Sequence, residues 1–96
     1  MLTPAQKRYL KGLANPIGKR YLLGKSEPDE GFYEVIDKAL EAHELIKVGL
    51  NQNATMKAKD IAPIIAEKVG AELVQVIGRV IVLYRESQKN KKIILK

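Results

Sequence analysis

The chain has no cysteine and a single histidine among its 96 residues. Disulfide bonds and zinc sites built on thiolates are therefore excluded, and a histidine-based metal cluster is not expected. No Cys/His pair exists for nucleophilic catalysis, and no serine stands in a nucleophile-elbow pattern. We therefore predict a protein that is not an enzyme and that needs neither a cofactor nor a metal.

The chain also lacks a long apolar run. No stretch approaches the length that a helix needs to cross a bilayer, and the first residues, MLTPAQKRYLKGLANP, place charges where a signal peptide is apolar. We expect a cytoplasmic, unprocessed protein with no membrane partner and no small-molecule substrate. Hydrophobic residues at 46% and charged residues at 29% are typical of a globular protein with one core. We expect a monomer with a single domain over residues 1–96 and a basic tail over about residues 86–96.

Positive and negative charges are segregated along the sequence, which carries a formal net charge of +6. Residues 1–25 hold six cations and no acid, residues 26–46 hold one cation and seven acids, and residues 47–96 hold ten cations and four acids. Such segregation is typical of a protein whose basic face meets a polyanion in one orientation. An ordinary soluble protein with a basic isoelectric point is an equally good interpretation of the charge alone.

The order of elements follows from the apolar pattern and from residues that begin or end helices. Thr3 and Pro4 are a typical helix start, because threonine caps the first turn and proline fits the first helical position. This helix is expected to end near Ala14. Its apolar side is formed by Ala5, Tyr9, Leu10 and Leu13, and its basic side by Lys7, Arg8 and Lys11. The segment KRYLLG that follows is typical of a short strand closed by Gly24.

A second helix has the clearest pattern, with Asp29 as the expected N-cap. Its buried face is predicted to contain Phe32, Val35, Ile36, Ala39, Leu40 and His43. The segment ELIKVGLNQN alternates as a strand does when one face lies in the core. KDIAPIIAEKVG is predicted as a third helix with Asp60 as cap, Pro63 in the first turn and Gly70 as the stop. ELVQVIGRVIVLYR is predicted as two strands that meet at Gly78.

The resulting order is αβαβαββ. It predicts an α+β fold, a two-layer sandwich in which three helices pack on a four-stranded mixed sheet. The tail ESQKNKKIILK is basic and ends in an apolar triplet. The sequence leaves open whether this tail pairs as an extra strand or stays loose.

Acidic side chains recur at helical spacing on the second helix: Glu30, Glu34, Asp37, Glu41 and Glu44. A solvated acidic surface is a better interpretation of them than a metal or acid/base site. His43 is expected to be a partly buried histidine near a helix end and not a ligand. Tyr9 and Phe32 are predicted to pack in the core. Tyr21, Tyr33 and Tyr84 could stack on bases but are better explained as residues at the edge of the core.

One loop combines features of a phosphate-binding site. In LLGKSEPDEGF, residues 22–32, a strand ends and a helix begins, and the backbone N–H groups at a helix start are unpaired. Gly24 lets a phosphate approach the backbone, and Lys25 supplies a cation beside it. A glycine that closes a strand before a capped helix explains the same residues. The cations Lys19 and Arg20 and those of the first helix strengthen the binding interpretation only if they surround this loop.

Several stretches taken together are more specific than any one of them: LTPAQKRYLKGLAN, LLGK, IDKALEAHELIKV, and AELVQVIGRVIVLYRES with KN and KIIL after it. In this order they resemble the bacterial YhbY-type CRM domain, the chloroplast RNA splicing and ribosome maturation domain, over about residues 2–95. The resemblance implies an αβαβαββ fold similar to KH-type RNA binders and to the C-terminal domain of translation initiation factor three. It also implies RNA binding, and for a bacterial member association with precursors of the large ribosomal subunit.

The most recognisable functional element of that family is a GxxG loop after the first strand, similar to the loop with which KH domains hold RNA backbone. Gly24 corresponds to its first glycine and Lys25 to the basic residue often found after it, while Glu27 stands in place of the second glycine. The RNA-binding residues that we predict from the resemblance and from the basic segments are Gly24, Lys25, Ser26, Lys19, Arg20, Lys7, Arg8 and Lys11.

We therefore predict a non-catalytic protein that binds ribosomal RNA in large-subunit precursors and assists ribosome assembly. The alternative is an adaptor in which the acidic second helix docks a basic ribosomal protein and RNA contact is secondary.

Overall fold

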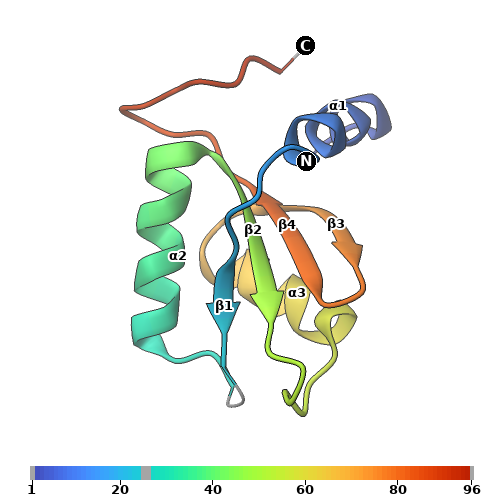
Figure 1. The fold of residues 1–96 in the computed structure, drawn as a ribbon. Helices are drawn as coiled ribbons and strands as arrows, with labels where there is room; N and C mark the ends of the chain where they lie inside the picture. The colour runs from blue at the N-terminus through green and yellow to red at the C-terminus, as the bar shows by residue number, and fades with distance from the viewer. Residues whose placement is uncertain (1, 25–26, 96) are drawn as a thin grey trace.

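In a computed structural model of the chain, residues 2–24 and 27–95 are described. Their helices and strands follow the order αβαβαββ (Figure 1). The bounds are α1 Pro4–Ala14, β1 Tyr21–Leu23, α2 Glu30–His43, β2 Leu45–Leu50, α3 Ala58–Lys68, β3 Glu72–Ile77 and β4 Val80–Tyr84. The predicted order of elements and the α+β class are confirmed.

The strands form one mixed sheet in the order β1-β2-β4-β3. β1 is parallel to β2, with Leu23 opposite Leu50, whereas the β2–β4 and β3–β4 pairs are antiparallel. β3 and β4 are joined by a tight turn at Gly78, whose φ of 57° is one that glycine adopts without strain. β1 is therefore an edge strand, and α2 is the crossover that its parallel pairing requires.

α2 and α3 cover one face of this sheet. Their buried side chains and those of the strands form the larger core cluster, which includes Ile36, Leu40, Ile65, Ile46, Val48, Ile81 and Leu83. Alternate residues of β2 point to this cluster, as the period of the strand predicted. The face holds most of the apolar residues that the sequence pattern assigned to the core.

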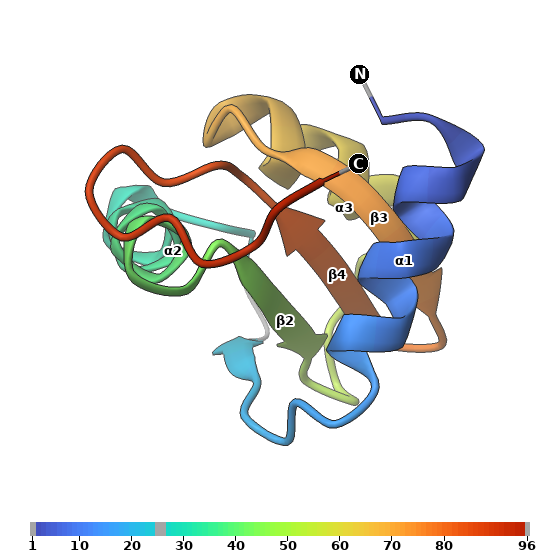
Figure 2. The same cartoon turned by 90° about the horizontal axis from the view of Figure 1, so that it is seen from above.

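α1 packs on the opposite face of the sheet (Figure 2). Leu10, which is fully buried, and Ala14 pack in a second cluster with Leu45, Val74, Val82 and Tyr84. Leu45 and Ile46 point to opposite faces and are both buried, because helices cover both sides of β2 at this point. The two predicted layers are thus the sheet and the α2/α3 layer, and α1 adds a partial third layer.

The helix ends that were predicted from capping residues are confirmed. Thr3 caps α1 by accepting the N–H of Gln6, and the side chain of Gln6 accepts the N–H of Thr3 in return. Asp29 caps α2 by accepting the N–H of Phe32 at 2.8 Å. Gly70 ends α3 with a φ of 65°.

The prediction for the start of α3 is wrong. The helix begins at Ala58, so Asp60 lies within the first turn, and no side-chain hydrogen bond caps the helix at Lys57. Pro63 consequently lies inside the helix, more than one turn from its start. Ala58 is buried against the larger cluster, and this packing extends the helix beyond the position that the proline indicated.

Four aromatic or helix-face residues lie elsewhere than predicted. Val35 and Tyr9 have exposed fractions of 52% and 50%, and His43 is exposed as well. α2 lies beside the edge strand β1, so only the central part of its apolar stripe reaches the sheet (Figure 1). Tyr84 is buried inside the second cluster and not at the edge of the core, because α1 covers it.

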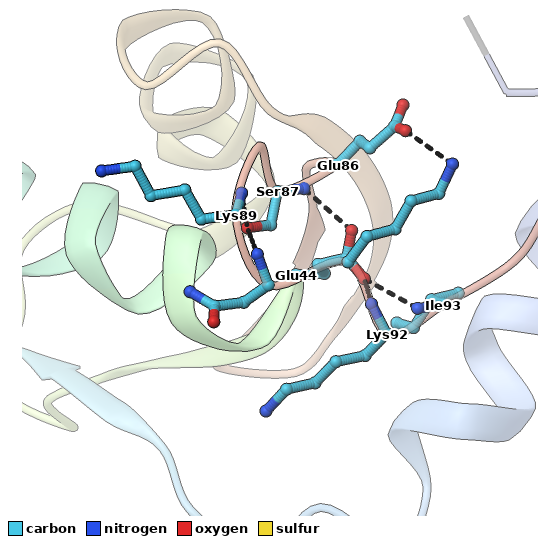
Figure 3. A network of polar contacts seen from close by, with 8 residues as sticks. Glu44, Glu86, Ser87, Lys89, Lys92 and Ile93 are labelled. Atoms are coloured by element: carbon cyan, nitrogen blue, oxygen red, sulfur yellow. Dashed lines mark hydrogen bonds and ion pairs between the residues drawn. The ribbon is translucent and has the colours of Figure 1, made fainter.

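The segment after β4 forms no strand within residues 85–95 and returns to the end of α2 (Figure 3). Glu44 is fully buried, and its carboxylate accepts the backbone N–H groups of Ser87, Lys92 and Ile93 at 2.8, 2.6 and 2.7 Å. Glu41 accepts the hydroxyl of Ser87 at 2.5 Å. Two carboxylates at one helix end therefore hold the C-terminal segment in place.

The predicted solvated acidic surface is wrong for two of its five acids, because Glu44 is buried and Glu41 is half-buried and accepts hydrogen bonds from the C-terminal segment. Besides Glu41 and Glu44, Asp37 is engaged, because Arg85 donates to its carboxylate at 2.6 Å and to its backbone carbonyl at 2.9 Å. Glu30, Glu34 and Asp37 are exposed as predicted, and Glu34 also pairs with Lys38 at 3.3 Å. No local pattern in the sequence predicts that the segment after β4 returns to α2.

The contacts of Glu44 lower its pKa. Burial by itself would raise the pKa of this carboxyl group, but the three N–H donors outweigh burial and hold the pKa below its ordinary value. The hydroxyl of Ser87 is the main cause that lowers the pKa of Glu41. Glu44 also has φ 65° and ψ −41°, a strained conformation for a residue with a side chain. The hydrogen bonds of its carboxylate and its backbone compensate for that strain.

Candidate functional site

A hollow of about 430 Å³, here called the loop hollow, lies between β1, the start of α2 and the residues that join them. Gly24 forms part of its wall, and Leu22 and Val35 line it with apolar surface. Leu22 is 73% exposed, although it belongs to a strand. The hollow thus combines bare backbone with exposed apolar side chains.

Gly24 is not required by the fold. The residue is exposed, and a Cβ at this position would meet no heavy atom within 4 Å. Among the described glycines, only Gly70 and Gly78 have a positive φ, so the backbone of Gly24 is one that any residue can adopt. Glycine at this position leaves the main chain uncovered by a side chain.

The charge that the described residues present in the loop hollow is negative. Glu27 and Asp29 line it, and no described cation does. Asp29 is engaged as the cap of α2, whereas Glu27 is exposed and contributes, after burial, to the raised pKa of Tyr33. Two predicted site residues, Lys25 and Ser26, lie outside the described residues.

Lys19 and Arg20 lie on the segment that leads into β1, at the end of this strand away from Gly24. The Nζ atom of Lys19 lies 4.9 Å from the centre of the Tyr21 ring. The arm of Arg20 lies over Gly49, since a Cβ on that glycine would stand 3.6 Å from Cδ of Arg20. Both cations are exposed and flank β1 without lining the loop hollow.

The cations of α1 lie at the opposite end of the molecule from the loop hollow (Figure 1). Lys7, Arg8 and Lys11 line a separate hollow of about 350 Å³ together with Leu2 and Pro4. The predicted binding residues therefore fall into separate groups, and no single small site contains them all.

Three cations that no sequence pattern indicated lie near the Gly24 end of the sheet. Lys57, Lys59 and Arg79 line a groove, here called the basic groove, between the β2–α3 segment, the start of α3 and the β3–β4 turn. Arg79 is 20 residues or more from the two lysines in the sequence, and the pairing of β4 with β2 brings it to their side of the sheet. The only earlier sign was the excess of cations in residues 47–96.

No group of three or more His, Cys, Asp and Glu side chains in residues 2–24 and 27–95 could hold a metal ion. Within the same ranges, no helix has the length and apolarity that a membrane crossing requires.

Comparison with known proteins gives one consistent result. The CRS1/YhbY (CRM) domain profile matches residues 2–85. The "Probable RNA-binding protein YqeI" of Bacillus subtilis (strain 168) is 41% identical over 93 residues, which cover 97% of each chain. An "RNA-binding protein" of Haemophilus influenzae is 38% identical over 90 residues, 94% of this chain and 91% of the relative. The solution structure of the hypothetical protein SAV1595 from Staphylococcus aureus, proposed to bind RNA, matches with a TM-score of 0.83 and 47% identity over the whole of both chains.

Proposed function

Because the chain belongs to the CRS1/YhbY (CRM) domain family, we propose that it is an RNA-binding protein without catalytic activity. The observation that carries this proposal is similarity over nearly the whole chain to relatives named for RNA binding. In its finer form, the proposal is that the RNA is ribosomal RNA in precursors of the large subunit, and that binding assists assembly of the subunit. The family resemblance supports this finer form.

The geometry suits a ligand with a charged backbone and flat rings. In this proposal a phosphate approaches the main chain at Gly24 beside Lys25, and sugar or base faces lie against Leu22 and Val35. Lys19 and Arg20 neutralise phosphates that pass along β1. The cations of α1 lie too far away for the same few nucleotides and contact a more distant part of the RNA.

RNA affinity is expected to fall steeply with added salt. If about four phosphates are neutralised, the slope of log K against log[salt] is about −3, because each contact on a single strand contributes about −0.7. The measurement is a titration of a labelled transcript of large-subunit ribosomal RNA at several salt concentrations. A slope near zero would count against a phosphate-binding role for these residues.

Gly24→Ala is expected to weaken RNA binding about tenfold, the cost of losing one charge-assisted backbone contact. The free energy of unfolding should change by less than about 0.5 kcal/mol, because the new methyl group meets no neighbour. RNA titration and urea unfolding measure the two effects. Gly12→Ala is the matched control, since a Cβ is equally unobstructed there but lies on the helix α1. Equal affinity of Gly24→Ala and the unsubstituted protein would remove this glycine from the interface.

The adaptor alternative has less acidic surface available than the sequence suggested. Glu41 and Glu44 are engaged by residues that follow β4, and the exposed carboxylate of Asp37 is paired with Arg85, which leaves Glu30 and Glu34 as the exposed acids of α2 without a contact to that segment. Ribonuclease treatment of a lysate separates the two functions. The protein leaves the ribosomal-precursor fraction if RNA holds it there, and remains if a protein partner does.

A further inference from the structure

The basic groove and the loop hollow differ in charge. The groove has a volume of about 610 Å³, contains the three cations Lys57, Lys59 and Arg79, and is lined by no acid among the residues that the structure describes. The loop hollow is lined by Glu27 and Asp29. A concave surface lined by one sign of charge focuses the electrostatic potential and concentrates ions of the opposite sign. The groove therefore attracts phosphate, and the described part of the loop hollow does not.

The cations of the basic groove are available to a ligand. All three side chains are exposed, and none of them forms an ion pair with a carboxylate in the described part of the chain. Asn51, Gln52 and Thr55 add neutral polar groups to the same lining. An anion that binds here does not have to displace an existing partner.

Backbone hydrogen bonds join the walls of the two surfaces. The N–H of Asn51 donates to the carbonyl of Leu23 at 3.0 Å, and the N–H of Leu50 donates to the carbonyl of Arg79 at 2.8 Å. Leu23 lines the loop hollow, and the other three residues line the basic groove. Neighbouring strands lie about 4.8 Å apart. The two surfaces therefore open at the same end of the sheet, roughly one strand apart.

We propose that the basic groove is the main phosphate-binding part of the RNA interface, a role that rests on the RNA-binding function proposed above. An RNA strand that passes over Gly24 continues across the ends of β1 and β2 into the groove. There Lys57, Lys59 and Arg79 neutralise successive phosphates. In the loop hollow, Glu27 and Asp29 oppose phosphate, so one phosphate approaches only the main chain at Gly24, and the sugar and base faces lie against Leu22 and Val35.

A titration of fluorescein-labelled single-stranded RNA of mixed sequence, about 16 nucleotides long, tests this role. The combined variant Lys57→Gln, Lys59→Gln and Arg79→Gln is expected to bind about 100-fold more weakly, and the magnitude of its salt slope should fall by about 2, because three phosphate contacts are lost.

Two further variants are measured beside it. Lys7→Gln, Arg8→Gln and Lys11→Gln together remove the same charge from the opposite end of the molecule and should weaken binding by less than about tenfold. Lys38→Gln removes an exposed cation of α2 that pairs with Glu34, and should leave the affinity unchanged. Thermal unfolding of each variant checks that it is folded.

The outcomes separate the two proposals. If the unsubstituted protein binds the RNA and the groove variant binds it equally well, the role of the groove is overturned and the RNA-binding function stands. A larger loss from the α1 variant than from the groove variant also overturns the role of the groove. If the unsubstituted protein binds no RNA at any salt concentration, both proposals fail.

Discussion

Glu44→Ala is expected to lower the free energy of unfolding by about 3 kcal/mol and to release the C-terminal segment. The buried carboxylate accepts three backbone N–H groups, and each hydrogen bond to a charged acceptor is worth roughly 1.5–3 kcal/mol. The total loss stays below their sum because the released segment regains hydrogen bonds to water. Urea unfolding measures the loss, and hydrogen exchange at Ser87, Lys92 and Ile93 reports the release.

Two variants of the same residue separate charge from backbone strain. Glu44→Gly should be about 1 kcal/mol more stable than Glu44→Ala, because glycine adopts a positive φ without strain. Glu44→Gln keeps the shape and removes the charge. Since the folded protein lowers the pKa of Glu44, its contribution is complete above the ordinary value of 4.5 and is lost as the pH falls through the lowered value. The stability difference between Glu44→Gln and the unsubstituted protein should therefore shrink below about pH 4.5; a constant difference would show that the charge is not the cause.

Leu10→Ala is expected to cost about 3 kcal/mol, because removing a buried leucine side chain from a core costs about 2–5 kcal/mol. Leu10 is fully buried and is the larger of the two buried side chains, Leu10 and Ala14, that α1 contributes to the second cluster. RNA affinity at the loop hollow and the basic groove should remain, since α1 lies at the other end of the molecule (Figure 1). Urea unfolding and RNA titration of the same samples measure both effects.

Tyr9→Ala is the control for this substitution. Tyr9 is the preceding residue of α1 and is half exposed, so its removal should cost less than about 1 kcal/mol. If both variants lost the same stability, the packing of α1 on the sheet would have to differ from that described here.

Helix ends that are set by a capping residue next to them were predictable from the sequence. Thr3, Asp29 and Gly70 act through their own backbone neighbours, so they placed the helix ends that they cap or close. Asp60 has the same chemistry as Asp29 but lies within α3, because burial of Ala58 extends that helix toward its N-terminus. Local chemistry is thus overridden where packing against a distant element is stronger.

The candidate site was predictable only in part, for a related reason. Gly24 follows from the position of a loop, which is a local property. The basic groove depends on the order of strands in the sheet, which joins cations from separate segments. Glu44 was assigned to a solvated surface because its partners are 43 to 49 residues away in the sequence. No spacing rule relates residues at such separations.

In the proposed RNA interface, the short edge strand β1 couples RNA binding to local order in the fold. β1 has three residues and one neighbour, so separating it from β2 breaks few hydrogen bonds and costs less than unfolding the sheet. Gly24 follows β1, whereas Asn51 follows the neighbouring strand β2 and Arg79 lies in the turn between β3 and β4. An RNA strand that contacts both Gly24 and the basic groove keeps β1 paired with β2. RNA binding then makes β1 more rigid, and a more rigid β1 in turn raises the affinity for RNA. A substitution that loosens the pairing of β1 with β2 therefore weakens RNA binding without contacting the RNA.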